Sequence, residues 1–349
     1  MTTGKRKPMS VTIKELSAHC GLSVSTVSKA LNGYPDISEE TREQVRQAAE
    51  QLGYRPNAQA RSLKLGRTFN LGVLYSDDTE SGFTHSIISP VLQAFKTEAE
   101  RRGYDITFIT HHMGDTRMTY LEHCRYRNVD GVCIVCSHFS SAEVVELVAS
   151  SLPVVTIDHV FHDHTCVQSQ NRQGMEELTR YVIARGHRRI AYVTGEESSV
   201  TDVRTVSFLR AMNEAGLDVP PGYLVPAAYH NPAVTREATL RLLKQGPRPT
   251  CILMPDDYAA LGGMEAVRAC GLRIPEDVSV AGFDGVKLLQ MCAPALTTVE
   301  QDTQRIGSEA ARQLVHLIEH PRTTYHELIT IPCRLLEGAT VARPSTAAG

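Results

Sequence analysis

The chain has 349 residues, which is enough for two or three domains. Its formal net charge is −3, so the chain as a whole lacks the strong positive charge of a general nucleic-acid binder. The charge is unevenly distributed, because residues 1–64 carry 10 Lys/Arg and 6 Asp/Glu, a balance of +4 that leaves −7 for the remainder. A basic segment on an acidic body is typical of a DNA-contacting module joined to a ligand-binding body.

The sequence has no feature of a membrane or secreted protein. No apolar run approaches the roughly 18 residues needed to span a membrane, and no apolar segment follows the basic N-terminus, as it would in a signal peptide. The nine cysteines are an odd number scattered over a long chain, which favours reduced thiols over a disulfide framework. We therefore expect a cytoplasmic protein without a membrane partner.

The N-terminal 56 residues predict three short helices. Thr12 and Glu15 form a capping-box pattern before a first helix that Gly21 ends. Ser23 can cap a second helix over residues 24–31, and Ser38 a third that ends before Gly53. This spacing predicts an all-α helix-turn-helix headpiece.

The second of these helices has a polar face suited to DNA. Val27 and Leu31 share one side of the helix, whereas Ser25 and Lys29, four residues apart, lie on the opposite side. Val24, near the helix start, is suited to contact a thymine methyl group. The alternative interpretation is a small three-helix domain whose polar face is merely solvated.

From residue 69 onward, short apolar runs alternate with helical segments, which predicts parallel sheets in a doubly wound α/β body with two subdomains. Strands are predicted at residues 71–75, 106–109, 131–136, 154–157, 190–194, 251–254 and 278–283, and helices at 90–102, 142–150, 175–185, 203–215, 233–245 and 259–269. Ligands of such folds bind beyond the carboxyl ends of the strands. Polar residues at these ends, including Asp158, Asp256 and Asp284, are therefore candidate site residues.

Several other patterns do not support a metal, redox or catalytic site. Cys133 and Cys136 fall in a predicted strand, where residues three apart point to opposite faces. A loop rich in His and Cys, and the pair at residues 111–112, are better explained as polar loops than as metal sites. No phosphate-binding loop, nucleophile elbow or zinc-protease motif is present. We expect no metal, no cofactor and no enzymatic activity.

Residues 11–65 resemble the headpiece of LacI/GalR-family transcriptional regulators, and the resemblance continues to about residue 336. The headpiece motifs that carry it are Thr12-Ile13-Lys14-Glu15-Leu16-Ser17, Gly21-Leu22-Ser23, Thr26-Val27-Ser28-Lys29-Ala30-Leu31-Asn32, Gly53-Tyr54-Arg55-Pro56-Asn57 and Ala60-Arg61-Ser62-Leu63. Matches in the body include Gly186-His187, Arg204 with Phe208, Val280-Ala281-Gly282-Phe283-Asp284 and Leu296-Thr297-Thr298-Val299. The headpiece motifs are highly specific, whereas those in the body indicate the sensor fold and not its ligand.

The resemblance implies roles for the DNA-contacting residues. Val24, Ser25 and Lys29 would read base edges, and Thr26, Ser28, Asn32, Tyr54 and Asn57 would position the DNA backbone. Residues 57–64 would form a hinge helix that pairs with its dimer mate and enters the minor groove. There Ala60 and Arg61 would lie close to the groove, and Leu63 would wedge between base pairs.

The resemblance also implies a two-lobed, periplasmic-binding-protein-like body with an effector in its cleft. Arg204 matches a cleft arginine and Asp284 an acidic effector contact. Asp158 and Asp256 match polar cleft positions, and Phe83, Tyr75, Tyr258 or Phe161 could supply an apolar wall. Purely structural roles remain open for two of these residues. Asp256 could be a helix cap, and Arg204 could form a surface ion pair. The chain departs from the family pattern at Ser207, which replaces a glycine, and at Gln170-Asn171, and it has no tryptophan.

The expected domains are a headpiece at residues 9–56, a hinge at 57–68, a body at 69–340 and a disordered tail at 341–349. Within the body, one lobe would comprise residues 69–169 and 300–328, and the other residues 170–299 and 329–340. We expect a homodimeric repressor of carbohydrate-related genes that binds a palindromic double-stranded DNA operator and responds to a small-molecule effector, a sugar or sugar derivative. The alternatives are a solute-binding protein and a sugar- or nucleoside-processing enzyme.

Overall fold

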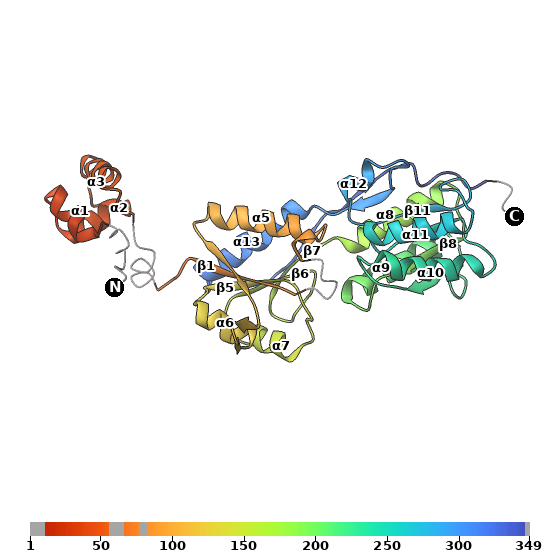
Figure 1. Cartoon of the computed structure of the whole chain (residues 1–349), viewed down its shortest axis with the longest axis horizontal. Coiled ribbons are helices and arrows are strands. Elements are labelled where there is room, and N and C mark those ends of the chain that lie inside the picture. The colour runs from red at the N-terminus through yellow and green to blue at the C-terminus, as the bar shows by residue number, and fades with distance from the viewer. Residues whose placement is uncertain (1–10, 56–65, 77–81, 346–349) are drawn as a thin grey trace, which may run out of the picture. The chain divides into compact units, whose positions relative to one another are not determined.

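The computed structural model describes residues 11–55, 66–76 and 82–345, except for the side chain of Phe83. The chain divides into two compact units, Met1–Thr68 and Phe69–Gly349 (Figure 1). We call the first unit the headpiece and the second the body. The fold class predicted from the sequence, an all-α headpiece and an α/β body with parallel sheets, is confirmed.

The headpiece contains α1 (Ile13–Cys20), α2 (Val24–Leu31) and α3 (Glu39–Leu52). The predicted capping box of Thr12 and Glu15 is present, and Gly53 ends α3 in the left-handed conformation with φ of 64°. Leu16, Val27 and Val45, one from each helix, are fully buried and pack together in its core. Local capping signals and one small apolar core thus account for this unit.

The first lobe of the body is a parallel six-stranded sheet in the order β13-β7-β6-β5-β1-β2. Helices α5 and α13 pack on one face of the sheet, and α6 and α7 on the other. Both faces are covered, so the central strands are continuous apolar runs. The strands are β1 (Asn70–Tyr75), β2 (Asp105–Ile109), β5 (Gly131–Cys136), β6 (Val154–Ile157), β7 (Thr165–Ser169) and β13 (Leu328–Ile331), and the helices are η1 (Gly82–Thr84), α5 (Ile88–Arg101), α6 (Tyr120–Arg127), α7 (Ala142–Val148) and α13 (Thr303–Glu319).

The second lobe is built on a parallel four-stranded sheet in the order β11-β10-β8-β9. Helices α8 and α9 pack on one face, and α10 and α11 on the other. Its strands are β8 (Ile190–Thr194), β9 (Leu224–Pro226), β10 (Cys251–Leu253) and β11 (Ser279–Ala281), and its helices are α8 (Asn171–Ala184), α9 (Ser199–Glu214), α10 (Pro232–Lys244), α11 (Asp257–Ala269) and α12 (Lys287–Gln290).

The chain passes between the two lobes three times. The first passage follows β7 and the second follows β12 (Thr298–Glu300), which pairs with β14 (Arg334–Leu336). The third follows Ile331, because all of β13 pairs with β7 in the first sheet. The expected lobe boundary at residues 328/329 is therefore three residues too early.

Two further expectations are corrected. The tail was expected to be disordered from residue 341, but Val341 is buried in the second lobe, and Ala342 exchanges hydrogen bonds with Ser279 and His187. Cys133 and Cys136 were expected on opposite faces, yet both contact the same core cluster. The register between β1 and β5 shifts just before Cys136, which interrupts the alternation. All nine cysteines are free thiols.

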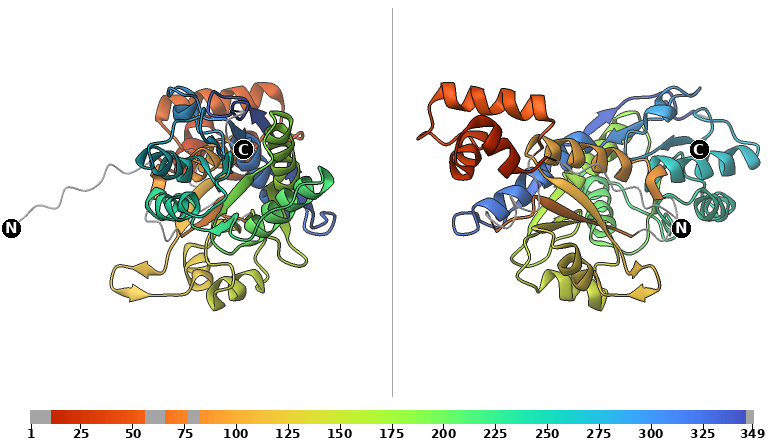
Figure 2. Two further views of the ribbon diagram at one scale, coloured as in Figure 1. Left: turned by 90° about the vertical axis from the view of Figure 1, so that its right-hand side faces the viewer. Right: turned by 60° about the vertical axis from the view of Figure 1, so that its left-hand side comes forward.

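Some elements were not predicted from the sequence. The helices α6 and α13 and the strand β7 are the largest of these, and the short ribbon of β3 (His112–Met113) and β4 (Thr116–Arg117) projects from the first lobe (Figure 2). Across the described ranges, none of the helices combines the length and the hydropathy that a membrane span requires.

Candidate functional site

Helix α2 has the two faces that the sequence predicts. Val27 and Ala30 are buried against α1 and α3, whereas Val24 is 40% exposed and Ser25 is exposed. Lys29 lies on the same outer side and forms an ion pair with Asp36, which raises the pKa of the lysine through their side-chain hydrogen bond. The side chain of Lys29 remains 41% exposed, so this cation can exchange Asp36 for another anion.

The side chains expected to position DNA differ in how far they are already held by contacts within the headpiece. The hydroxyl of Thr26 lies 2.8 Å from the Ser23 hydroxyl at the start of α2. Asn32 donates from Nδ2 to the Ser28 carbonyl at 2.6 Å, so its amide is already held against the helix end. Tyr54 is half-buried on the headpiece core, and burial raises its pKa. Asn57, Ala60, Arg61 and Leu63 lie outside the described residues.

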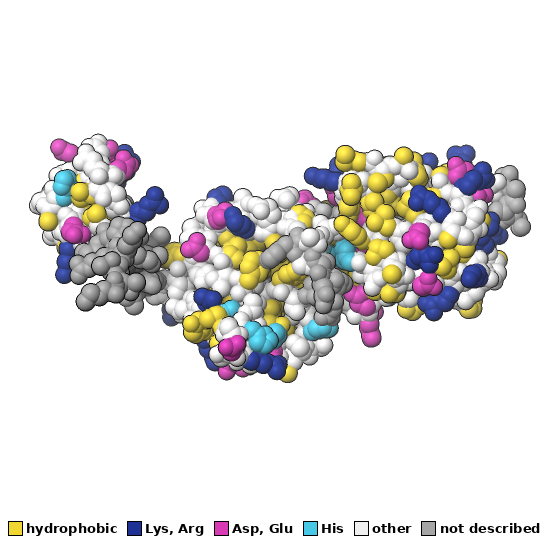
Figure 3. Space-filling view, viewed as in Figure 1, with side chains coloured by type: hydrophobic (Ala, Val, Ile, Leu, Met, Phe, Trp, Pro, Cys, Tyr) yellow, Lys and Arg dark blue, Asp and Glu magenta, His cyan; other side chains and the backbone are white. Residues whose placement is uncertain are grey.

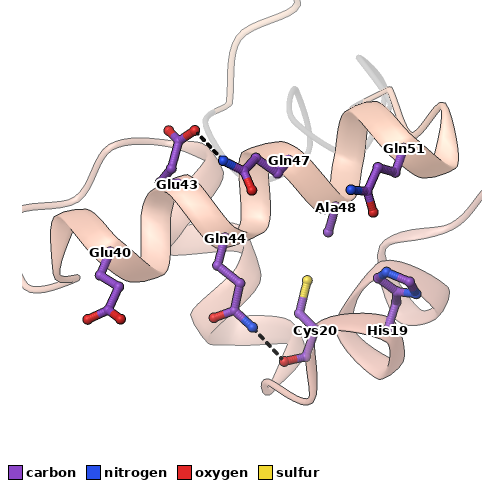
Figure 4. A pocket seen from close by; sticks show the side chains of 8 residues that line it. All are labelled: His19, Cys20, Glu40, Glu43, Gln44, Gln47, Ala48 and Gln51. Atoms are coloured by element: carbon purple, nitrogen blue, oxygen red, sulfur yellow. Dashed lines mark hydrogen bonds between the residues drawn. The ribbon is translucent and has the colours of Figure 1, made fainter.

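The headpiece also contains a polar cavity of about 430 Å³ between the end of α1 and α3. Figure 4 shows its lining, with Gln44 donating to the Cys20 carbonyl and Gln47 to Glu43. The lining residues are His19, Cys20, Glu40, Glu43, Gln44, Gln47, Ala48 and Gln51. None of the base-reading candidates on α2 is among them, so this cavity is separate from the predicted DNA-reading face.

Arg204 lies at the centre of a buried charged cluster in the second lobe. It projects from α9 with only 4% of its surface exposed, so the alternative of a surface ion pair is wrong. Its Nε donates to Asn171 Oδ1 and its Nη1 to the Pro255 carbonyl, both at 2.9 Å. The guanidinium carbon lies 3.6 Å from the centre of the Phe283 ring, a cation–π contact that fixes its plane.

Two adjacent aspartates begin α11 beside this arginine. Asp256 Oδ1 accepts from the Ala259 amide at 2.8 Å, which confirms the helix-cap interpretation, and its Oδ2 accepts from the His230 amide at 2.7 Å. Asp257 accepts from the Val286 amide at 2.7 Å and the Thr298 hydroxyl at 2.5 Å. Asp256 is therefore both a cap and a member of the cluster.

Asp284 links the cluster to the first lobe. It follows β11 with φ of 121°, and its Oδ1 accepts from Gln301 Nε2 at 2.7 Å. Gln301 Oε1 in turn accepts from the Ser169 hydroxyl, at the end of β7, at 2.5 Å. All three side chains are buried, so a continuous chain of buried hydrogen bonds joins Asp284 to a strand of the other lobe.

The first-lobe candidates are placed as follows. Asp158 follows β6 with φ of 58°, its carboxylate accepts from the Ser169 amide at 3.4 Å, and its carbonyl accepts from the Ser199 hydroxyl of the second lobe at 3.5 Å. Tyr75 packs against the first-lobe core and donates its hydroxyl to the Gly82 carbonyl. The side chain of Phe83 lies outside the described residues.

Sequence reasoning missed several members of the cluster. His230, Gln301 and Tyr229 were not candidates, although Tyr229 bonds Thr201 and packs against Gly195. His230 directly precedes the Asn-Pro pair that begins α10, a pattern that predicts a helix start but not a functional histidine. The others come from segments far apart in the chain, so no local pattern connects them.

Burial shapes the protonation of the three cluster aspartates. It raises the pKa of Asp256, raises that of Asp257 to about 7, and raises that of Asp284 well above its ordinary range, with the neighbouring Asp256 charge adding to the last. A carboxyl with a raised pKa stabilises the fold fully below its unfolded pKa, and this contribution is lost as pH rises through the folded pKa.

This shift predicts a pH-dependent difference between the natural protein and Asp257→Asn. Between pH 4 and pH 8 the natural protein should lose up to about 4 kcal/mol of stability relative to the variant, the value of a shift from 3.8 to about 7. Urea unfolding at several pH values measures it. Asp277→Asn is the control. The pKa of Asp277 is lowered to about 2, so this carboxylate stays ionised in the folded protein throughout the pH range, and its variant should not show the same loss. A pH-independent difference for Asp257→Asn would contradict the prediction.

Comparisons with known proteins identify the family. Residues 12–57 match the model of bacterial regulatory proteins of the lacI family, and residues 179–341 match a periplasmic binding protein-like domain. The HTH-type transcriptional repressor PurR of Haemophilus influenzae is 31% identical over 314 residues, covering 88% of this chain and 91% of the relative. The chain belongs to the LacI family.

Other relatives agree across nearly the whole length of the chain. PurR of Erwinia tasmaniensis is 32% identical and covers 95% of the chain and 97% of the relative. The crystal structure of the lac repressor dimer bound to operator and an anti-inducer shares the fold with a TM-score of 0.76 at 24% identity, covering 96% of this chain and all of that one. A LacI-family regulatory protein from Chloroflexus aggregans is 29% identical with a TM-score of 0.69, covering 78% and 98%.

These findings confirm the predicted family. The LacI-family chain is a DNA-binding transcriptional repressor, as its relatives are, and not an enzyme. The alternatives of a solute-binding protein and of a sugar-processing enzyme are therefore set aside.

Proposed function

We propose that this LacI-family repressor binds a palindromic operator as a homodimer, and that a sugar or sugar derivative at the second-lobe cluster controls its operator affinity. The genes it controls would be carbohydrate-related. The observation that carries the DNA part is the outer face of α2, where Ser25 and Lys29 lie opposite the buried Val27 and Val24 is exposed at the helix start. A capped helix that presents a hydroxyl and a cation on its outer face can enter the major groove and form hydrogen bonds with base edges there.

The DNA contacts divide by chemistry. Val24, Ser25 and Lys29 would choose the sequence through base edges, and Thr26, Ser28, Asn32, Tyr54 and Asn57 would set register on the phosphates. Ala60, Arg61 and Leu63 would act in the minor groove. An isolated helix of about eight residues is marginal in water, so residues 57–64 would order as a helix only with dimer and DNA present.

Two surfaces of the body support a dimer. In the first lobe, a cavity of about 600 Å³ lies beside α5 and the edge strand β2, where Phe108 is 41% exposed. In the second lobe, Val234 on α10 and Leu261 on α11 are about equally exposed, and Figure 3 shows hydrophobic side chains on both lobes of the face it presents. Apolar patches of this kind are typical of protein interfaces, and two hinges over one palindrome require two chains.

The effector would bind in the charged cluster. Arg204 donates charge-assisted hydrogen bonds and Asp284 accepts them, and both suit the vicinal hydroxyls of a sugar. Asp256 and Asp158 would add acceptors, with Tyr75 and Phe83 of the first lobe as an apolar wall. Because Asp284 is joined through Gln301 to Ser169 in β7, an effector that moves Asp284 would change how the lobes meet. Linkage requires DNA to change effector affinity by the same factor.

The operator-binding proposal predicts a large effect of Leu63→Ala in the full chain. Loss of a buried leucine wedge should weaken operator binding by about 10- to 100-fold, since burying such a side chain is worth about 1.5–3 kcal/mol, and should reduce the DNA bend. Fluorescence anisotropy over a salt series measures affinity, which should fall steeply as salt rises. Leu288→Ala, which alters an exposed leucine of the body, should leave affinity unchanged. Unchanged affinity and bend for Leu63→Ala would refute the wedge.

A further inference from the structure

His230, Asp256 and Asp284 bring three potential metal ligands to one point in the second lobe. Their ligand atoms all lie within 4.8 Å of one another. The three residues come from separate segments: the loop before α10, the start of α11 and the loop after β11. No metal site was expected from the sequence, and these three residues are at least 26 positions apart in the chain.

The spacing suits an ion better than a direct contact. His230 Nε2 and Asp284 Oδ2 are 3.9 Å apart, which is too long for a hydrogen bond. Metal–nitrogen and metal–oxygen bonds of about 2.0–2.2 Å add to roughly 4.2 Å across an ion. An ion bound to both atoms would therefore hold them at an angle of about 135°, with Asp256 as the third ligand.

The cluster contains more carboxyl groups than permanently positive side chains. Asp256, Asp257 and Asp284 are 1%, 0% and 5% exposed, and Arg204, at 4%, is the buried guanidinium that faces them. When all three carboxyls are ionised, their charge exceeds the one permanent positive charge beside them. Buried carboxyls in excess are neutralised either by protons or by a coordinated metal, so this cluster can accept a cation in exchange for protons.

A second observation points to a ligand at the same place. The hydroxyl of Tyr192, on β8, has no hydrogen-bond partner among the described residues, and the residue is 1% exposed. Its electrostatic neighbours are Tyr229, Arg204 and Asp256, so the hydroxyl is directed toward the cluster. A water carried by a bound ion, or a ligand held by it, would satisfy this group.

We propose that His230, Asp256 and Asp284 hold a divalent first-row transition cation, of the Mn²⁺ or Zn²⁺ class. One imidazole with two carboxylates is a mixed nitrogen and oxygen donor set that such ions accept. The ion would occupy the cluster proposed to bind the effector, so this inference deepens the proposed function. It rests on that function only for the claim that the ion affects operator binding. The His230 ring lies 3.8 Å from the His85 ring of the first lobe, so an ion on His230 also acts on the contact between lobes.

The test is Mn²⁺ binding to the full chain after removal of metals with a chelator. The electron paramagnetic resonance signal of free Mn²⁺ should fall until about one ion is bound per chain, and Zn²⁺ should compete. Asp284→Asn and His230→Gln should each weaken binding by roughly tenfold or more. His162→Gln is the matched control, because that histidine is 96% exposed in a loop that also carries His164; it should bind as the natural chain does.

The outcomes separate this inference from the repressor proposal. Absence of Mn²⁺ binding, equal binding by Asp284→Asn and His230→Gln, or loss of binding in His162→Gln would overturn the ion site. The same samples are titrated with operator DNA and checked for cooperative thermal unfolding, so a misfolded variant is recognised and replaced by the other. Intact operator binding without Mn²⁺ binding refutes the ion alone, and the reverse result refutes the operator.

Discussion

Gly307→Ala is expected to lower the free energy of unfolding of the body by about 2–3 kcal/mol. Gly307 lies in α13 where this helix crosses α5, and a Cβ atom there would stand 2.1 Å from the Val91 carbonyl oxygen and 2.9 Å from the Phe95 amide. These are backbone atoms, so the helices must separate. Overpacking of this kind costs about 1–3 kcal/mol or more, and the better helix propensity of alanine offsets only about 1 kcal/mol.

Urea unfolding followed by circular dichroism measures this loss. Ser308→Ala, one residue along the same helix and partly exposed, is the control and should change stability by less than about 0.5 kcal/mol. An independent repetition is Gly262→Ala in the second lobe, where a Cβ atom would lie 1.9 Å from the Pro232 carbonyl. A stabilised Gly307→Ala variant would mean that α5 and α13 approach each other less closely than described.

Much of the fold could be predicted because its signals are local. The strands β5, β6 and β8 have the predicted bounds, since each is a short apolar run with polar residues at its end. The caps of the headpiece helices were predicted for a similar reason, because each depends on residues three positions apart. Periodicity and capping depend on a few neighbouring residues, so they can be recognised without knowledge of the tertiary structure.

The features that sequence reasoning missed are those that depend on tertiary contacts. Helix α13 has an apolar stripe at Ile306, Ala310 and Leu314 and a cap at Asp302, so it could have been found. The close approach at Gly307 could not, because it requires knowing that α5 is the partner. The same holds for the charged cluster, where Asp284 meets Gln301 and His230 although the three residues come from separate segments of the chain.

Arg204 shows that residue type alone can give the wrong expectation about whether a side chain is buried. Arginine is usually exposed, so a surface ion pair was a reasonable alternative. The guanidinium is instead enclosed by Asn171, the Pro255 carbonyl and the Phe283 ring. An arginine that remains buried must be fixed by its partners, and its loss should therefore affect the whole second lobe.

Arg204→Met is accordingly expected to destabilise the protein by about 3–5 kcal/mol at pH 8, the cost of leaving buried charges without their partner. Asp256 and Asp284 would keep their burial and lose the cation, and Asn171 Oδ1 and the Pro255 carbonyl would lose their donor. The loss should be smaller at pH 5, because the raised pKa of both carboxyls then lets them take up protons in place of the missing charge.

The control is Arg210→Met, further along α9, whose side chain is 59% exposed and paired with Glu214. Exposed pairs are worth at most about 1 kcal/mol, so this variant isolates burial from the loss of an arginine as such. The double variant Arg204→Met with Asp284→Asn should recover part of the stability at pH 8, since it removes a charge that Arg204 balanced. If Arg204→Met were as mild as Arg210→Met, or equally harmful at both pH values, charge balance would not be what holds this cluster, and the case for a cation within it would weaken in the same step.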